Sequence, residues 1–237
     1  MIPSLEIQNY GWIRSLLIDR LGRVNLIVGK NGSGKTTILR AMREYARERK
    51  PTRFDDGGDV FLVPEDSDLA RLWGDIVLTS REDACLEMLD VIEQDIARVA
   101  LKGNDKESAI WFSRRSNKAV ERLEVLGTGA NVAFSYAVHA TRAAGGYLLV
   151  DGFENGLHPS VMEPVWTALF NLATRLDVQV FATTHSWDCI RAFCSLECSE
   201  ENAAVLVRLE RDGDGVTAHT FNADEQQMIV EQSIEVR

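Results

Sequence analysis

The stretch that decides the fold is Gly29-Lys30-Asn31-Gly32-Ser33-Gly34-Lys35-Thr36. It matches the phosphate-binding pattern G-x-x-x-x-G-K-[ST] at every fixed position. Residues 23–28 in front of it predict a buried strand, and residues 37–44 behind it predict a helix. In this setting the glycines let the loop curl, so that backbone N–H groups face an anion at a helix N-terminus. We therefore expect residues 29–37, through Thr37, to bind the phosphates of a nucleotide.

Two side chains of this loop have specific expected roles. The Lys35 ammonium can reach the outer phosphates, and the Thr36 hydroxyl can ligate Mg²⁺. The alternative is a chance glycine-rich turn, which the flanking strand and helix disfavour.

Length and apolar patterning bound the class of protein. A chain of 237 residues suits one α/β domain, so we expect residues 1–237 to form a single domain. No apolar run approaches the ~18 residues of a membrane span. Met1-Ile2-Pro3-Ser4-Leu5-Glu6 lacks the basic start and apolar stretch of a secretory signal. We expect a cytoplasmic protein with no membrane partner.

Charge argues against direct nucleic-acid binding, because that binding is largely charge neutralisation and the net charge here is −10. Basic residues do cluster at 47–50 and 114–118, which we interpret as solvated helix ends or loops. The cysteines Cys85, Cys189, Cys194 and Cys198 contain no C-x-x-C pair. A metal site is conceivable, but the spacing favours reduced thiols.

Apolar periodicity predicts an α/β fold with a mostly parallel sheet wrapped by helices, preceded by an N-terminal antiparallel flap. Strands are expected at residues 5–7, 13–18, 60–63, 109–112, 120–125, 147–150 and 178–182, and helices at 81–99, 131–144 and 160–175. Residues 51–58 and 102–107 read as a polar loop and a charged turn. Asp212-Gly213-Asp214-Gly215 imitates a metal-binding pair, but between strands at 203–210 and 216–221 it predicts a hairpin turn.

Two further sites follow buried strands. Asp151 ends the apolar run 148–150, where it can hold Mg²⁺ together with Thr36; the alternative is an aspartate that caps a turn. His185 follows the strand 178–182, in the crevice where α/β sheets bind ligands. It can contact the γ-phosphate or the attacking water, and the alternative is a capping or core histidine.

These motifs resemble those in the heads of ABC-type ATPases. The resemblance includes two further stretches, Gly152-Phe153-Glu154-Asn155-Gly156-Leu157-His158-Pro159 and Thr183-Thr184-His185-Ser186. The nearest resemblance is to OLD-like (overcoming lysogenization defect) ATPases, which are related to SMC and recF-type proteins. It covers nearly the whole chain and implies ATP and Mg²⁺ as cofactors. The short stretch from Lys50 to Leu126 has no room for the long coiled-coil arms of SMC proteins and shows no sustained heptads.

The resemblance also implies residue roles. Gly127, Thr128 and Gly129 occupy the signature position, which in such heads closes on the ATP held by a second subunit. Residues 155–158 correspond to the loop that crosses the dimer interface, and His185 corresponds to the switch histidine. Tyr10 or Trp12 is a candidate to flank the adenine, with a core position as the alternative.

The chain departs from the family pattern at three places. Gly127 replaces the usual signature serine, and the loop glutamine of the Mg²⁺ shell has only Glu65 or Asp66 as weak candidates. The largest departure is Gly152, which stands where the family has the glutamate that acts as general base. Glu154 is the next carboxylate along the chain. Unless it reaches the water, hydrolysis should be slow, by ~10²–10⁴ in rate.

Function is therefore expected to be that of an ATPase switch that dimerises head-to-head and controls an effector encoded separately. The resemblance implies a Toprim-type nuclease as that effector, in anti-phage defence. The alternative is an ATP-dependent scaffold or regulatory subunit that does not hydrolyse ATP. A GTPase lacks support, because Asn117-Lys118 is not followed by the aspartate that reads guanine.

Overall fold

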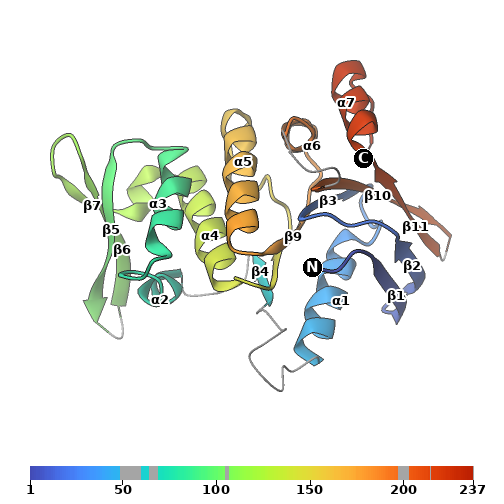
Figure 1. Ribbon diagram of the computed structural model, residues 1–237, viewed down its shortest axis with the longest axis horizontal. Coiled ribbons are helices and arrows are strands. Elements are labelled where there is room, and N and C mark those ends of the chain that lie inside the picture. The colour runs from blue at the N-terminus through green and yellow to red at the C-terminus, as the bar shows by residue number, and fades with distance from the viewer. Residues whose placement is uncertain (49–59, 64–68, 105–106, 197–202, 214, 237) are drawn as a thin grey trace.

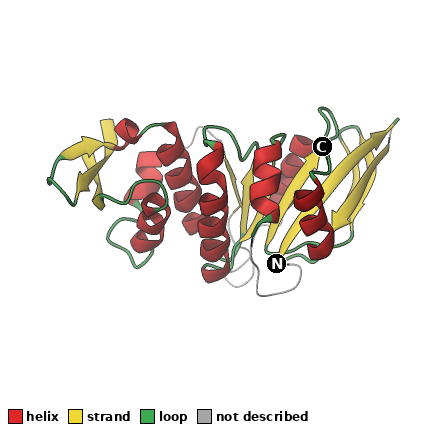
Figure 2. Cartoon of the chain, turned by 90° about the horizontal axis from the view of Figure 1, so that it is seen from above, coloured by secondary structure: helices red, strands yellow, loops and turns green. Residues whose placement is uncertain are grey.

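The structure is a computed structural model that describes residues 1–48, 60–63, 69–104, 107–196, 203–213 and 215–236. It is elongated, with the large central sheet towards one end, helices in the middle and a small sheet at the other end (Figures 1 and 2). Within the described residues, no helix is long and apolar enough to cross a membrane. The expected loop at 51–58 and the residues Glu65, Asp66, Cys198 and Asp214 lie outside the described residues.

The central sheet has six strands in the order β11-β10-β3-β9-β8-β4. Their bounds are β3 Val24–Gly29, β4 Val60–Val63, β8 Tyr147–Val150, β9 Gln179–Thr183, β10 Ala204–Asp212 and β11 Gly215–Phe221. The five strands from β10 to β4 run parallel, and β10 and β11 form an antiparallel hairpin. The expected mostly parallel sheet and the expected hairpin are therefore both confirmed. All residues of β3 and β9 are buried, as in a sheet covered on both faces.

Alternate residues of each central strand enter two different cores. On one face Ile27, Phe181 and Val207 pack with helix α1, Lys35–Glu48, and with the hairpin β1 Leu5–Tyr10 and β2 Ile13–Ile18. On the other face Leu26, Val180 and Leu206 pack with the remaining helices. These are α2 Leu69–Gly74, α3 Glu82–Asp90, α4 Thr128–Arg142, α5 Pro159–Arg175, α6 Trp187–Cys194 and α7 Ala223–Gln232. The expected antiparallel flap is the hairpin β1–β2.

The small sheet corrects the prediction of a helix over residues 81–99. Helix α3 ends at Asp90, and the sheet is built from β5 Ile96–Asn104, β6 Glu107–Arg114 and β7 Val120–Arg122. A β-bulge between Ile96 and Arg98 adds a residue, so Ile96 and Val99 both turn inward although they are three positions apart. That spacing imitates a helix, which explains the error. The expected turn at 102–107 is mostly strand.

Other boundaries also differ from expectation. The strand expected at 120–125 ends at Arg122 and continues as a 3₁₀ helix, Leu123–Leu126. Helices α2, α6 and α7 were not predicted, although α7 begins with a capping box of Asn222 and Glu225 that the sequence displays. Cys85 and Cys189 are buried free thiols, Cys194 is a partly buried free thiol, and no cluster in the described part of the chain offers three His, Cys, Asp or Glu metal ligands.

Candidate functional site

The glycine-rich loop connects β3 to α1 at the carboxyl edge of the central sheet. The buried Lys35 ammonium donates hydrogen bonds to the carbonyl oxygens of Gly29, at 2.7 Å, and Lys30, at 3.1 Å. Burial lowers the pKa of Lys35, and the carboxylates of Asp151 and Glu154 partly offset that effect. The cation is therefore held inside the curl of the loop, where the outer phosphates of a nucleotide would lie.

Asp151 joins three elements of this edge. It follows β8, and its Oδ2 accepts a hydrogen bond from the Thr36 hydroxyl of α1 at 2.9 Å. Its Oδ1 accepts from the Thr183 hydroxyl at the end of β9 at 2.6 Å. A hydroxyl and a carboxylate side by side are oxygen ligands that suit Mg²⁺, which commonly takes one or two protein ligands and completes its shell with phosphates and water. The residues present fit such an ion.

Glu154 and His185 lie on neighbouring turns. The Glu154 carboxylate accepts from the Thr184 hydroxyl at 2.7 Å and from the backbone N–H of His185 at 2.9 Å. Each carboxylate oxygen keeps acceptor capacity beyond these bonds. The turn after β8 and the turn after β9 are thus fastened to each other, and the backbone position of His185 is fixed by Glu154.

His185 lines a pocket of about 150 Å³ with residues of the glycine-rich loop. The lining consists of Trp12, Gly32, Gly34, Lys35, Thr36, Thr37 and His185. Trp12 is the flap residue at its rim, and the guanidinium of Arg211 lies 4.2 Å from the centroid of the indole. Of the two aromatic candidates for an adenine contact, Trp12 is the one that reaches the pocket.

Gly152 has a structural reason to be glycine. Its φ is +73°, and a Cβ placed there would lie 2.2 Å from Nδ2 of Asn155. Its N–H donates to the Thr183 hydroxyl at 2.9 Å, and its carbonyl accepts from the N–H of Asn155 at 2.9 Å. The positive φ strains any side chain at this position, and the glutamate that the family resemblance implies would also have to displace the Asn155 amide.

The signature residues form a second, separate cluster at the start of α4. Gly127 and Thr128 are exposed, and the Asn131 side-chain amide donates to the Gly127 carbonyl at 2.7 Å. Gly156 packs closely against them, since a Cβ there would lie 2.8 Å from Cγ2 of Thr128. The signature position and the loop at 155–158 are therefore neighbours, as the resemblance implies.

The two clusters are not joined. Among the described residues, no hydrogen bond or ion pair links Gly127, Thr128 or Gly129 to the glycine-rich loop. The structure thus brings together Lys35, Thr36, Asp151, Glu154 and His185, and it leaves Gly127–Gly129 apart. The residues that sequence reasoning left without a role are Thr183 and Thr184, whose hydroxyls hold the two carboxylates. Their signal is two hydroxyls directly after a buried strand.

Comparison with known proteins gives the family of the chain. Residues 4–124 match the family AAA_23, described as an AAA domain, over half of the chain. The chain belongs to this AAA domain family.

Two relatives are uncharacterized proteins of Methanocaldococcus jannaschii. MJECL10 is 43% identical over 42 residues, which are 18% of this chain and 19% of that protein. MJECL11 is 32% identical over 91 residues, which are 38% of this chain and 80% of that protein. The chain therefore matches less than a fifth of MJECL10 and most of MJECL11.

Solved structures with a similar fold are SMC heads. An Smc head bound to the C-winged helix domain of ScpA has a TM-score of 0.64 and 11% identity, covering 96% of this chain and 99% of that chain. The SMC head domain from Thermotoga maritima has a TM-score of 0.60 and 12% identity, covering 92% of this chain and 98% of that chain. An Smc head domain derived from Pyrococcus furiosus has a TM-score of 0.62 and 10% identity, covering 98% of each chain. The fold is that of an ABC-type, SMC-head-like P-loop ATPase, as predicted. The comparisons do not single out the OLD-like branch.

Proposed function

We propose that this chain is an ATP-binding, slowly hydrolysing switch that dimerises head-to-head on ATP and controls a separately encoded effector. One observation carries the proposal. The residues suited to phosphate and Mg²⁺ gather at one edge of the central sheet, whereas Gly127 and Thr128 lie exposed in a second cluster with Gly129. A signature cluster that does not line the pocket of its own glycine-rich loop is useful when it faces the loop of a second copy.

ATP binding in this proposal rests on residues 29–37. Their backbone N–H groups and the Lys35 ammonium meet the phosphates, while Thr36 and Asp151 hold Mg²⁺. When bound, Mg²⁺ neutralises charge that develops on the phosphates. Asp151 is oriented for this by the Thr183 hydroxyl, so its carboxylate does not depend on the ion for its position.

Hydrolysis is assigned to Glu154 and His185. His185 lines the pocket where the outer phosphates would lie, and Glu154 is the carboxylate that follows Asp151 in the same turn. Glu154 acts as the proton acceptor for water in this proposal, through the acceptor capacity that Thr184 and the His185 N–H leave open. Because it is displaced by two positions from the family's glutamate, we propose that turnover is slow.

Dimerisation is expected to be twofold, with the same patch used by both copies. Gly127, Thr128 and Gly129 stand at the N-terminus of α4, and its free N–H groups and positive dipole end favour an anion such as the γ-phosphate of the partner's nucleotide. The whole chain, residues 1–237, acts as one cytoplasmic ATPase domain in this proposal.

The effector is a separate protein. An Smc head has been solved with a domain of another protein, ScpA, bound to it, which supports the idea that heads of this fold can hold partner chains. The family resemblance of the motifs favours a Toprim-type nuclease in anti-phage defence. Net charge of −10 favours a protein partner over direct binding of nucleic acid.

A second candidate function is a scaffold that binds ATP without hydrolysing it. The tight turn at Gly152 favours it, because a glutamate cannot occupy that position without moving Asn155. In a scaffold, ATP binding itself would be the signal.

Single-turnover measurement separates the two. Protein in excess over radiolabelled ATP and Mg²⁺ is followed for phosphate release, while its mass is measured in parallel by light scattering. The switch predicts a dimer that releases phosphate slowly, at a rate that falls with Glu154→Gln. A stable ATP-bound dimer that releases no phosphate over hours supports the scaffold. A protein that neither binds ATP nor dimerises would overturn both functions.

A further inference from the structure

The sheet β5–β7 presents a face to solvent at the end of the molecule farthest from the hairpin β10–β11 (Figure 1). Its inner face is apolar, since Val99, Ile110 and Phe112 are at most 5% exposed in the main core. The pairing places Ala100, Trp111 and Arg122 in one row across the three strands, and Arg98 opposite Ser113 in the next. Paired residues share a face. Among the residues whose side chains the structure describes, the outward set is Arg98, Ala100, Lys102, Ala109, Trp111, Ser113, Val120 and Arg122.

Two cations approach one aromatic ring on this outward side, and Arg98 shares the same face. We call this surface the cationic sheet face and define it by Arg98, Lys102, Trp111 and Arg122. Lys102 Nζ lies 5.0 Å from the centroid of the Trp111 indole, and Arg122 Cζ lies 5.7 Å from it. They approach from strands on opposite sides of β6. Their neighbours Ala100, Ala109 and Ser113 are small, so the charged heads stand above a shallow apolar floor.

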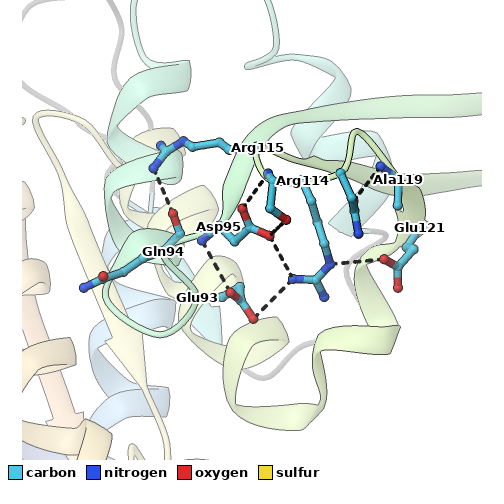
Figure 3. A network of polar contacts seen from close by, with 9 residues as sticks. Glu93, Gln94, Asp95, Arg114, Arg115, Ala119 and Glu121 are labelled. Carbon is cyan, nitrogen blue, oxygen red and sulfur yellow. Dashed lines mark hydrogen bonds and ion pairs between the residues drawn. The ribbon is translucent and has the colours of Figure 1, made fainter.

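Three carboxylates at the base of the sheet, those of Glu93, Asp95 and Glu121, are engaged by Arg114 (Figure 3). Arg114 forms ion pairs with Glu93, Asp95 and Glu121, and Arg115 pairs with Asp90. These bonds fasten the end of α3 to the base of the sheet. In the part of the chain that the structure describes, no ion pair involves Arg98, Lys102 or Arg122. A protein of net charge −10 thus places three cations on one small face, and none of them pairs with a carboxylate among the described residues.

We propose that the cationic sheet face docks a short acidic segment of the effector protein. The docking proposal rests on the proposed function, which supplies the effector. It adds where the effector binds and which charge its binding segment carries. Carboxylates of an extended segment would pair with Arg98, Lys102 and Arg122.

The surroundings favour an acidic segment over a nucleic-acid strand. A long polyanion leaving this face passes the exposed Glu124, which lies two residues after Arg122 in the chain. Base stacking needs a free aromatic face, whereas the indole of Trp111 already carries a cation from each neighbouring strand. A short segment matches the size of the face and avoids that acidic border.

Fluorescence anisotropy with a defined probe tests the proposal. The probe is a fluorescein-labelled peptide of about ten residues with Glu at alternate positions, which an extended chain presents on one side. The full chain is compared with Lys102→Glu/Arg122→Glu and with Arg40→Glu/Arg175→Glu, which makes the same change in net charge at exposed residues of α1 and α5. We expect the first variant to bind at least about tenfold more weakly, because like charges now face each other, and the control to bind like the unmodified chain.

A labelled oligothymidylate of similar length is measured in the same way. Equal peptide binding by the unmodified chain and Lys102→Glu/Arg122→Glu would overturn the proposal, and so would no peptide binding at all. Tighter binding of the oligonucleotide, lost in the same variant, would overturn it in favour of a nucleic-acid surface. ATP-dependent dimerisation, measured on all three proteins, should be unchanged, so a failed docking surface is distinguishable from a failed ATP switch.

Discussion

The glycine-rich edge and the signature cluster carry the same kind of chemistry, anion binding at a helix N-terminus, but they are built differently. At the edge, Asp151 and Glu154 are each held by two hydrogen bonds to neighbouring turns, and Lys35 is fixed by loop carbonyls. At the signature, Gly127 and Thr128 stand exposed, with contacts from Glu124, Asn131 and Gly156. We propose that the first is a self-contained site and that the second is completed by the glycine-rich loop of a second copy.

The largest expected effect lies within the self-contained edge. Glu154→Gln should keep ATP binding and dimerisation but lose turnover by about a hundredfold, because an amide cannot accept the proton from water. Phosphate release measures the rate, and Glu163→Gln on α5 is the matched control at an exposed carboxylate. Unchanged turnover in Glu154→Gln would remove the catalytic role and leave Glu154 as a brace for His185.

The next effect concerns ATP affinity. Lys35→Ala removes the buried cation of the loop, so ATP should bind at least about tenfold more weakly. Titration with a fluorescent ATP analogue gives the affinity, with Lys118→Ala, an exposed lysine of the β6–β7 turn, as the control. If Lys35→Ala bound ATP with the unmodified affinity, the assignment of the phosphate site would be wrong.

A substitution at Gly152 tests whether the turn after Asp151 tolerates a side chain. Gly152→Glu restores the family's glutamate in the sequence, but the positive φ and the contact with Asn155 make it strained. We expect the free energy of unfolding to fall by about 1–2 kcal/mol, with no gain in turnover. Denaturant unfolding and phosphate release check this together. Faster hydrolysis in a stable variant would show that the turn can open.

The smallest effect is expected at Thr183. Thr183→Val keeps the shape but removes the donor to Asp151 and leaves the N–H of Gly152 without its acceptor. The free energy of unfolding should fall by about 1 kcal/mol, and higher Mg²⁺ should be needed for half-maximal ATP binding. Thr167→Val, at an exposed helical threonine of α5, controls for the loss of a hydroxyl. An identical Mg²⁺ dependence would mean that Asp151 needs no orienting partner.

The sequence predicted the edge better than the rest because its signals are local. A glycine-rich loop between a buried strand and a helix, and polar residues directly after buried strands, locate Lys35, Thr36, Asp151 and His185 without any tertiary information. The hydrogen bonds of Thr183 and Thr184 could not be predicted, since they join turns that are far apart in the chain. The adjacency of Gly156 and Thr128 was implied only by the family resemblance, and the structure supplies the contact itself.

The small sheet was mispredicted for a physical reason. The bulge between Ile96 and Arg98 breaks the two-residue alternation, so the inward positions 96 and 99 followed a helical spacing. The pairing of β5 with β6 then decides which cations share a face, and that cannot be read from charge clusters along the chain. In the cluster at 114–118, Arg114 and Arg115 form ion pairs with carboxylates. The cations of the cationic sheet face come instead from two strands, Arg98 and Lys102 from β5 and Arg122 from β7.

The central claim is that a second copy completes the ATP site, and light scattering tests it most directly. The mass of the full chain is measured at tens of micromolar without nucleotide, with ADP, and with Mg²⁺ and a non-hydrolysable ATP analogue, for the unmodified chain and for Thr128→Trp, which enlarges an exposed signature residue. We predict that both proteins bind the analogue, but that the analogue doubles the mass of the unmodified chain and leaves Thr128→Trp a monomer. A monomer under all three conditions, or a dimer that Thr128→Trp leaves intact, would contradict the claim.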